Sequence, residues 1–429
     1  MFIMFEASRW TRARMVRAVT HVRTILGLTF AVVASSLVVP AHAADVTPQP
    51  CSQLAVSPDF VHDHTAFCGG TVTQDFAPVG LALYISSNRG HTWHKASAAG
   101  LPYKAGDRMT DLILSPRYAT DHTVFVSVMS EGVYESQDSG ETFAPLLVGS
   151  TPPVRAFVSG ADLLGTGAAE RAMLISPNWV NGTPILIDPA THLIQPVTGA
   201  PGQVADFVVS PDWINDHTAI AFTHTGSAAS RQVSAFGCSI AFDCKAPLGT
   251  FPKGFEYRAS WIAADFVTSR TLFIQLDSAT STAVPRLYVS RNGGKTFSLL
   301  VGAQAILSAR VEKPERDVQP AVDIAAGPPG TARLWLRVYG SPWARPPASE
   351  LYRSDDNGRT WTSVAYRRIA QPGPKGAMPD LRVPVGPVQP RVLVAATADN
   401  HVFVNGVTKG GWGVGCSANG GRTWATYCP

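Results

Sequence analysis

The chain contains 429 residues, with 35 Lys and Arg against 31 Asp and Glu. Residues 1–43 hold five of these basic residues and one of the acids, so the rest of the chain carries 30 of each. This balance removes the support for binding to nucleic acid or to an anionic membrane surface through bulk charge.

The first 43 residues predict an export signal. Five arginines precede an apolar run from Ile25 to Val39, and the small-residue site Ala41-His42-Ala43 follows it. This order is typical of a secretory signal peptide. The apolar run is shorter than the roughly 20 residues that a membrane-spanning helix needs. We expect residues 1–43 to be a signal peptide and residues 44–429 one exported domain without a membrane span, secreted or held in the envelope of a bacterium.

Six cysteines lie in the exported part of the chain. An even number of cysteines in an oxidising compartment favours disulfides. Neighbours in sequence suggest the pairs Cys51–Cys68, Cys238–Cys244 and Cys416–Cys428, although six cysteines allow many other pairings. No two of them have C-x-x-C spacing and no His pair accompanies them, so we expect no metal site and no cofactor.

A repeat unites much of the exported chain. Its fullest copies contain an apolar run, Ser-Pro, a turn, Asp-His-Thr and a second apolar run, in Leu54–Phe67, Leu112–Phe125 and Phe207–Ile220. Weaker copies begin near Leu174, Ile262, Val322 and Leu381. Alternating apolar residues and Gly/Asn/Asp turns predict four short strands in each unit, with strand A ending at Ser-Pro and strand B following Asp-His-Thr.

A second motif of eight residues occurs five times after a predicted strand C. It consists of Ser, any residue, Asp or Asn, any residue, Gly, any residue, Thr and an aromatic residue. We expect it to form the turn between strands C and D, because a short polar side chain accepts backbone N–H bonds and Gly adopts positive φ at low cost. The predicted structural residues are Ser86, Asn88, Gly90 and Trp93; Ser136, Asp138, Gly140 and Phe143; Ser290, Asn292, Gly294 and Phe297; Ser354, Asp356, Gly358 and Trp361; and Ser417, Asn419, Gly421 and Trp424.

These boxes resemble the Asp-box, or bacterial neuraminidase repeat (BNR), and the exported chain resembles an Asp-box β-propeller. The resemblance implies an all-β fold: a single propeller of seven four-stranded blades, or of six. Proteins with this repeat include sialidases, xyloglucan-cleaving glycosidases, sortilin-type receptors and a photosystem II assembly factor family, so the repeat implies a fold and leaves the function open. Only Asp138 and Asp356 keep the acid, which suits a turn acceptor better than a catalyst.

The Asp-His pairs at Asp63, Asp121 and Asp216 invite a metal or catalytic assignment. They occupy the same A-to-B turn of three different units, however, and such turns are spread around the rim of a propeller. We therefore favour a turn-capping role for the three aspartates.

Ligands usually reach a propeller through the face that carries the B-to-C and D-to-A connections. Five residues in or beside these connections are candidates for ligand binding, since Arg can hold carboxylates and Trp can stack on a sugar or a peptide. They are Arg108, Arg155, Arg310, Arg316 and Trp343.

Two functions from different classes fit these features. One is a monomeric, non-catalytic binding or scaffold propeller that recognises a glycan or an envelope or extracellular protein. The other is a glycoside hydrolase of sialidase-like type. The Arg-Ile-Pro signature of sialidases does not occur, and no acid pair can be assigned from the sequence. The sequence therefore favours binding, and no residue is assigned a catalytic role.

Overall fold

The computed structural model divides the chain into two units, Met1–His42 and Ala43–Pro429. The structure describes residues 51, 53–74, 77–104, 107–148, 155–159, 171–179, 183–227, 230–263, 266–279, 284–311, 321–326, 331–339, 349–364, 394–396, 400–408 and 411–424. The predicted signal peptide lies outside these residues. No helix in the described ranges is long and apolar enough to cross a membrane.

Six four-stranded antiparallel sheets, the blades, follow one another along the chain, and their strands pair in sequence order. Blade 1 contains β1 (Gln53–Val56), β2 (Ala66–Gln74), β3 (Ala77–Ser86) and β4 (His94–Lys95). Blade 2 contains β5 (Met109–Leu114), β6 (Val124–Val128), β7 (Gly132–Ser136) and β8 (Ala144–Val148). Blade 3 contains β9 (Arg155–Ser159), β10 (Arg171–Trp179), β11 (Thr183–Asp188) and β12 (Leu193–Pro196).

The remaining blades repeat this order. Blade 4 contains β13 (Gln203–Val209), β14 (Ala219–Thr225), β15 (Gln232–Cys238) and β16 (Ala246–Thr250). Blade 5 contains β17 (Phe255–Ile262), β18 (Leu272–Ser278), β19 (Arg286–Ser290) and β20 (Ser298–Leu299). Blade 6 contains β21 (Ala321–Ala326), β22 (Leu334–Tyr339), β23 (Ser349–Ser354) and β24 (Thr362–Val364). A three-stranded sheet follows, with β25 (Val394–Ala396), β26 (Val402–Thr408) and β27 (Gly411–Ser417).

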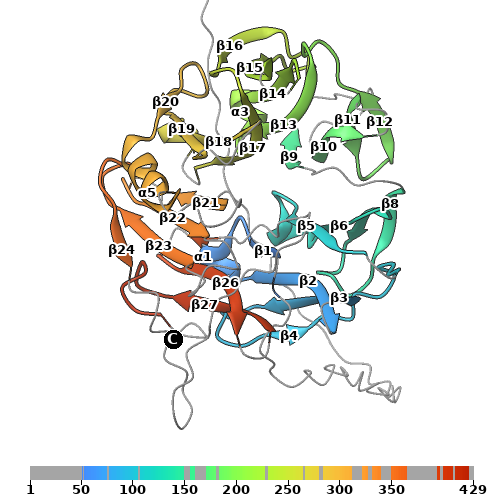
Figure 1. Ribbon diagram of the computed structural model, residues 1–429. Coiled ribbons are helices and arrows are strands. Elements are labelled where there is room, and N and C mark those ends of the chain that lie inside the picture. Colours follow the sequence, from blue (N-terminus) through green and yellow to red (C-terminus); the bar gives the residue numbers. More distant parts are fainter. Residues whose placement is uncertain are drawn as a thin grey trace, which may run out of the picture. The chain divides into compact units, whose positions relative to one another are not determined.

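The first strands of the sheets form the inner ring of a propeller. β1, β5, β9, β13, β17, β21 and β25 contact one another in this order, and β25 contacts β1. The colours of Figure 1 follow the sheets round this ring. Apolar clusters fill the joints between neighbouring sheets. The all-β propeller predicted from the repeats is therefore confirmed.

The predicted number of blades needs a correction. The structure has six four-stranded blades, which is the lower number that the sequence allowed, and seven four-stranded blades are not supported. The sheet β25–β27 has three strands among the described residues, and its apolar residues Phe403, Val414 and Cys416 close the ring against blade 1.

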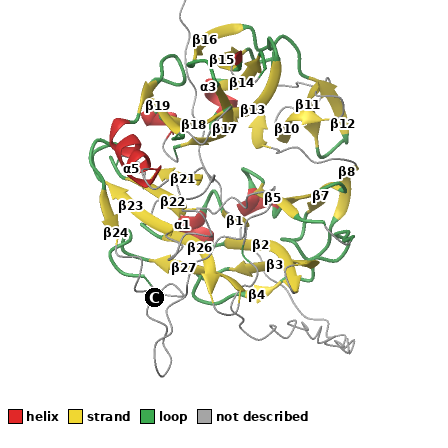
Figure 2. Ribbon diagram, viewed as in Figure 1, coloured by secondary structure: helices red, strands yellow, loops and turns green. Residues whose placement is uncertain are grey.

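One predicted start of a repeat unit is wrong. Leu174 does not begin a unit, since it lies within β10, the second strand of blade 3. The prediction was wrong because a Ser-Pro pair also follows Leu174, as it does at the end of the first strands. The structure also contains a helix of eleven residues, α5 (Val301–Val311), after β20, which the sequence analysis did not predict. Figure 2 shows α5 in red among the yellow strands. Its Ala303 and Leu307 are fully buried in the joint between blades 5 and 6.

Short helices of four residues connect the first and second strands of four blades. They are α1 (Phe60–Asp63), α2 (Tyr118–Asp121), α3 (Trp213–Asp216) and α4 (Phe266–Ser269), and each begins with a buried aromatic residue. The residue directly after each helix has positive φ; these residues are His64, His122, His217 and Arg270. These three histidines therefore end helical turns.

Each of the five boxes has the same set of internal hydrogen bonds, and the second box is described as the example. Gly140 N–H donates to Ser136 Oγ (2.7 Å), and Ser136 Oγ donates to Asp138 Oδ1 (2.7 Å). The amide of Thr142 donates to the same Asp138 oxygen (2.8 Å). Each box follows the third strand of its sheet, which is the predicted position.

Asn replaces Asp in three boxes without breaking this set of hydrogen bonds. In the first box, Thr92 N–H donates to Asn88 Oδ1 and Asn88 Nδ2 donates to Thr92 Oγ1, both at 2.9 Å. In the second box, which has Asp, the hydrogen bond between the two side chains runs the other way: Thr142 Oγ1 donates to Asp138 Oδ2. A threonine hydroxyl can donate or accept, so either side chain satisfies the turn.

The glycine of the box also forms part of the joint between blades. A Cβ on Gly294 would lie 2.2 Å from Cδ1 of Ile220, and one on Gly358 would lie 2.7 Å from Cδ1 of Leu300. In both boxes, the contacted side chain belongs to the preceding blade or to the residue that follows its last strand. The box therefore needs Gly both for its positive φ and for the close approach of the neighbouring blade.

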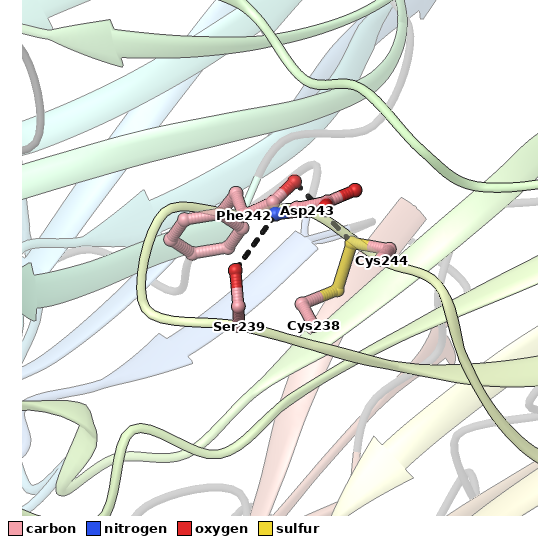
Figure 3. Close-up of a disulfide and its surroundings, with 5 residues drawn as sticks. All are labelled: Cys238, Ser239, Phe242, Asp243 and Cys244. Carbon is pink, nitrogen blue, oxygen red and sulfur yellow. Dashed lines mark hydrogen bonds between the residues drawn. A yellow bond between two sulfur atoms is a disulfide. The ribbon is translucent and has the colours of Figure 1, made fainter.

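Blade 4 has a disulfide where other blades have a box. Cys238 lies at the end of β15 opposite Ala219, just as Ser86 lies opposite Ala66 at the end of β3. It bonds to Cys244, and Asp243 N–H donates to Ser239 Oγ (3.2 Å) within the closed loop (Figure 3). The loop packs its buried Phe242 against Trp213, with 4.7 Å between ring centroids.

The other predicted disulfides have different outcomes. Cys51 bonds to Cys68, as predicted, so the disulfide joins the chain before β1 to β2. Cys416 is also disulfide-bonded, and its predicted partner Cys428 lies outside the described residues.

The third box provides a matched test of the joint. Gly293 and Gly294 both have positive φ, but a Cβ on Gly293 would meet no atom within 4 Å. We expect Gly293→Ala to lower the free energy of unfolding by about 1 kcal/mol, the usual cost of a left-handed residue. Gly294→Ala should cost about 1–3 kcal/mol more, because its methyl group overpacks Ile220. Urea unfolding of both variants measures the difference, and equal losses would contradict the proposed role of the joint.

Candidate functional site

The two faces of the propeller are distinguished by hydrogen bonds between turns. In blade 1, Arg89 N–H of the box donates to the carbonyl of His64 in the A-to-B turn (2.9 Å). Ser139 and His122 form the same bond in blade 2 (3.1 Å), as do Gly293 and Arg270 in blade 5 (2.9 Å). We call the face with these turns the turn face. The B-to-C and D-to-A connections lie on the other face, which we call the loop face.

The aspartates of the A-to-B turns bond within their own turns, and Asp216 also forms an ion pair with Arg270 in the turn of the next blade. Asp121 Oδ1 accepts from Thr123 N–H (2.9 Å), and its Oδ2 accepts from Ser115 Oγ (2.7 Å). Asp63 and Asp216 make the equivalent bonds. No group of three or more His, Cys, Asp or Glu among the described residues could hold a metal ion. These bonds support the turn-capping role that we favoured for the three aspartates.

The structure does not bring the five predicted ligand residues into one described site. Arg316 and Trp343 lie outside the described residues. Arg155 begins β9 and Arg310 lies in α5, but the side chains of both are also outside them. Arg108 is half-buried just before β5, and its carbonyl accepts a hydrogen bond from Met129 N–H (2.8 Å). Their role in binding therefore stays a prediction.

Charged side chains that the sequence analysis did not single out gather on the loop face of blades 4 and 5. Glu256 of β17 lies directly opposite Asp277 of β18 in the antiparallel register. Such pairs place their side chains on the same face of the sheet with Cβ atoms about 5 Å apart. Arg231, which precedes β15 in blade 4, forms an ion pair with Glu256 (2.5 Å). Arg258 Nε lies 3.6 Å from Asp277 Oδ2. We call these four residues the loop-face cluster.

The exposure and pKa values of the two acids differ. The Glu256 side chain is 42% exposed, whereas that of Asp277 is 15% exposed. Burial raises the pKa of Asp277, and the charge of Glu256 adds to this effect. A hydrogen bond from Gln275 Nε2 (2.7 Å) and the charge of Arg258 oppose the rise without cancelling it. The cluster therefore combines an accessible carboxylate with one that holds its proton to higher pH.

A buried polar group lies between the inner strands of the same two blades. Asp206 of β13 is 1% exposed and accepts a hydrogen bond from Phe207 N–H (2.8 Å). The hydroxyl of Tyr257, from β17, donates to Asp206, and Ser260 Oγ lies 2.8 Å from the Tyr257 oxygen. Tyr257 and Asp206 thus form a hydrogen-bonded pair between blades 4 and 5.

The sequence contains a weak signal for the loop-face cluster. In "LFIQLDS", Gln275 and Asp277 alternate with apolar residues in a strand that is otherwise typical of a buried core. Two polar residues on one side of such a strand indicate a functional or paired environment. The partners Glu256 and Arg231 come from other strands, so only the pairing register identifies them.

Comparisons with known proteins support the fold and leave the function open. No family model matches the chain, and no curated protein does. Among solved structures, the chain is similar to an oligogalacturonate lyase in complex with manganese, with a TM-score of 0.50 and 11% identity over 86% of this chain and 88% of that one. A GH74 xyloglucanase from Xanthomonas campestris gives a TM-score of 0.40 and 18% identity over 88% of this chain. The match spans 47% of the xyloglucanase, about half of its length.

YCF48 from Cyanidioschyzon merolae is a third similar structure, with a TM-score of 0.44 and 12% identity over 87% of this chain and 97% of that one. At 11% identity, the similarity to the oligogalacturonate lyase shows the fold alone.

Acid titration tests the role of the box aspartates. Hydrogen bonds from the side chain and amide of Thr360 lower the pKa of Asp356 to about 2. Its contribution to stability is therefore complete above the unfolded pKa, near 4, and is lost as the pH falls toward 2. We expect Asp356→Asn to unfold at nearly the wild-type temperature at pH 7 and to lose less stability between pH 4 and 2. Parallel melting curves over this range would contradict the assignment.

The pH dependence of Asp277 should have the opposite sign. A carboxyl group with a raised pKa in the folded state favours folding at low pH, and this advantage is lost as the pH rises through the folded-state pKa. Asp277→Asn, which cannot ionise, should therefore gain melting temperature relative to the wild type as the pH rises above about 4. Thermal melts from pH 3 to pH 7 measure this gain. A constant difference between the two proteins would show that burial does not perturb Asp277.

Proposed function

We propose that this chain is a secreted or envelope-bound, non-catalytic binding propeller that recognises a glycan or a protein through its loop face. The observation that carries the proposal is the ion pairing of the loop-face cluster, in which each carboxylate faces an arginine. An arginine that contacts a carboxylate has further N–H donors for a polar ligand. The charges are thereby held in fixed positions, as recognition requires.

Two observations support the proposed location and state. Disulfides such as Cys51–Cys68 persist in oxidising compartments outside the cytosol. The apolar joints close the ring within one chain, so we propose that the protein acts as a monomer.

A glycoside hydrolase of sialidase-like type is the second candidate function. The specific observation in its favour is the opposed pair Glu256 and Asp277, because two carboxyl groups with different pKa values can divide the roles of acid and base. The similarity to a xyloglucanase adds no weight beyond the fold.

One experiment separates the two functions. The protein from residue 44 onward is incubated with immobilised sialylated and neutral glycans, and both protein retention and sugar release are measured. We expect retention without release, and Arg258→Ala should weaken retention at least about tenfold. Release of sugar that Asp277→Asn abolishes would overturn the binding assignment in favour of the hydrolase.

Arg333→Ala provides the matched control. Arg333 forms an equivalent ion pair with Asp355, but beside the box of blade 6 on the turn face. Retention should be unchanged in this variant. If both arginine variants lose retention equally, the loop-face cluster is not the binding site.

A further inference from the structure

Blade 1 leaves most of one strand edge uncovered. Its third strand, β3, has ten residues, whereas its outer strand, β4, has two. β4 pairs only with Tyr84 and Ile85, and Ala96 N–H extends the contact with one hydrogen bond to the carbonyl of Leu83 (2.9 Å). Among the described residues, no strand pairs with this side of β3 before that point.

The chain leaves β3 because it turns toward blade 2. Ala98 N–H donates to the carbonyl of Gly140 (3.2 Å), and Ala99 N–H donates to the carbonyl of Glu141 (3.0 Å). Both acceptors belong to the box of blade 2. The residues that would have continued the outer strand of blade 1 are thus bonded to its neighbour.

The register shows which backbone groups are left at the edge. The Leu83 carbonyl points outward, because it accepts from Ala96 on the outer side. Backbone groups two residues apart in a strand point to the same side. The N–H and C=O of Leu81 therefore also point outward, at the point where β4 no longer covers β3.

A pocket of about 280 Å³ lies beside this edge. β3 contributes Leu81 and Ala82 to its lining, and the segment after β4 contributes Ala98 and Leu101. Lys95, Ser97 and Tyr103 also line the pocket, and none of the described lining residues is acidic. The lining therefore combines apolar side chains with polar ones and one positive charge.

Blade 5 shows what covers such an edge elsewhere. Its outer strand β20 is also two residues long, but α5 follows it. Ala303 and Leu307 of α5 are buried in the same cluster as Leu287 of β19, and Gln304 Nε2 donates to the carbonyl of Pro285 just before β19 (3.2 Å). In blade 5 the helix α5 thus packs beside the third strand, whereas in blade 1 a pocket lies at the equivalent position.

We propose that the outer edge of β3 is a docking site for an extended segment of a partner protein, which adds to blade 1 as a further strand. Backbone groups of the segment bond to Leu81, every second side chain enters the pocket, and an acidic side chain meets Lys95. The charge of Lys95 and the outward backbone groups, which no described strand pairs with, together select an acidic, extended peptide. The site shares no residue with the loop-face cluster, so it is independent of the proposed function.

The test uses a fluorescent ten-residue peptide in which Val alternates with Glu, and a counterpart in which Lys replaces Glu. Fluorescence anisotropy with the whole exported chain should show saturable binding of the Glu peptide and at least about tenfold weaker binding of the Lys peptide. Hydrogen exchange of the segment 79–86 should slow when the Glu peptide binds.

Two variants address the two parts of the site. Leu81→Pro removes the outward N–H without removing a bond to β2, and Lys95→Glu reverses the charge of the pocket. Each should weaken binding of the Glu peptide at least about tenfold. The melting temperature of Lys95→Glu should stay near that of the wild type, whereas Leu81→Pro should melt lower, because it also removes a side chain that packs in the joint between blades 1 and 2. Lys253→Glu, a reversal at an exposed lysine of the loop face, is the matched control and should bind normally.

Three results would overturn the proposal. One is the absence of saturable binding to the wild type, and the second is equal binding of the Glu peptide to wild type and Leu81→Pro. The third is a dimer in sedimentation velocity that Leu81→Pro dissociates, since a second copy of this chain would then be the occupant.

Discussion

The propeller depends on the way in which each third strand ends. In five sheets a serine hydroxyl at that position accepts a hydrogen bond from a glycine amide and donates one to an Asp or Asn. In four of them the turn also brings the glycine close to a side chain of the previous blade. Blade 4 reaches the same end with the Cys238–Cys244 bond, and blade 3 with Asp188, whose carboxylate accepts from Ala190 N–H (3.0 Å). The third strand of each sheet thus ends in a turn closed by its own residues, although the residues that close it differ between blades. What the fold requires there is a strand end whose polar groups are satisfied within the turn and whose outer surface fits the neighbouring sheet.

The repeats allowed much of this fold to be predicted from the sequence, because their period records local chemistry. The Ser-Pro and Asp-His-Thr patterns located first and second strands, and the boxes located third strands. The prediction failed where the local pattern was shared by a different element. Leu174 precedes Ser-Pro but lies in a second strand, and the helix α5 arises where Ala303 and Leu307 fill a joint that a strand fills elsewhere. Such choices are made by packing between blades, which no single segment encodes.

The candidate site could be predicted to a much smaller extent. Its residues belong to three strands or their ends, and Glu256 meets Asp277 only through the register of β17 and β18. That register includes a bulge between Tyr257 and Ala259, which shifts every later side chain by one position. The arginines chosen from the sequence were selected because they lie in connections. The arginines of the loop-face cluster were not among them: Arg231 lies just before β15, and Arg258 lies within β17 at the bulge. Their acidic partners are identified only by the pairing of the strands.

The closure of the ring has a consequence for the order of folding. Every described blade is built from consecutive strands, so six of the joints connect segments that are near in sequence. The remaining joint places Phe60 against Phe403, with 5.6 Å between ring centroids, although these residues lie near opposite ends of the described chain. Because the entropy lost on loop closure grows with loop length, this contact is the most expensive to form early. The seam between the first blade and the three-stranded sheet should therefore close last during folding, and it is the natural point at which the ring would first open.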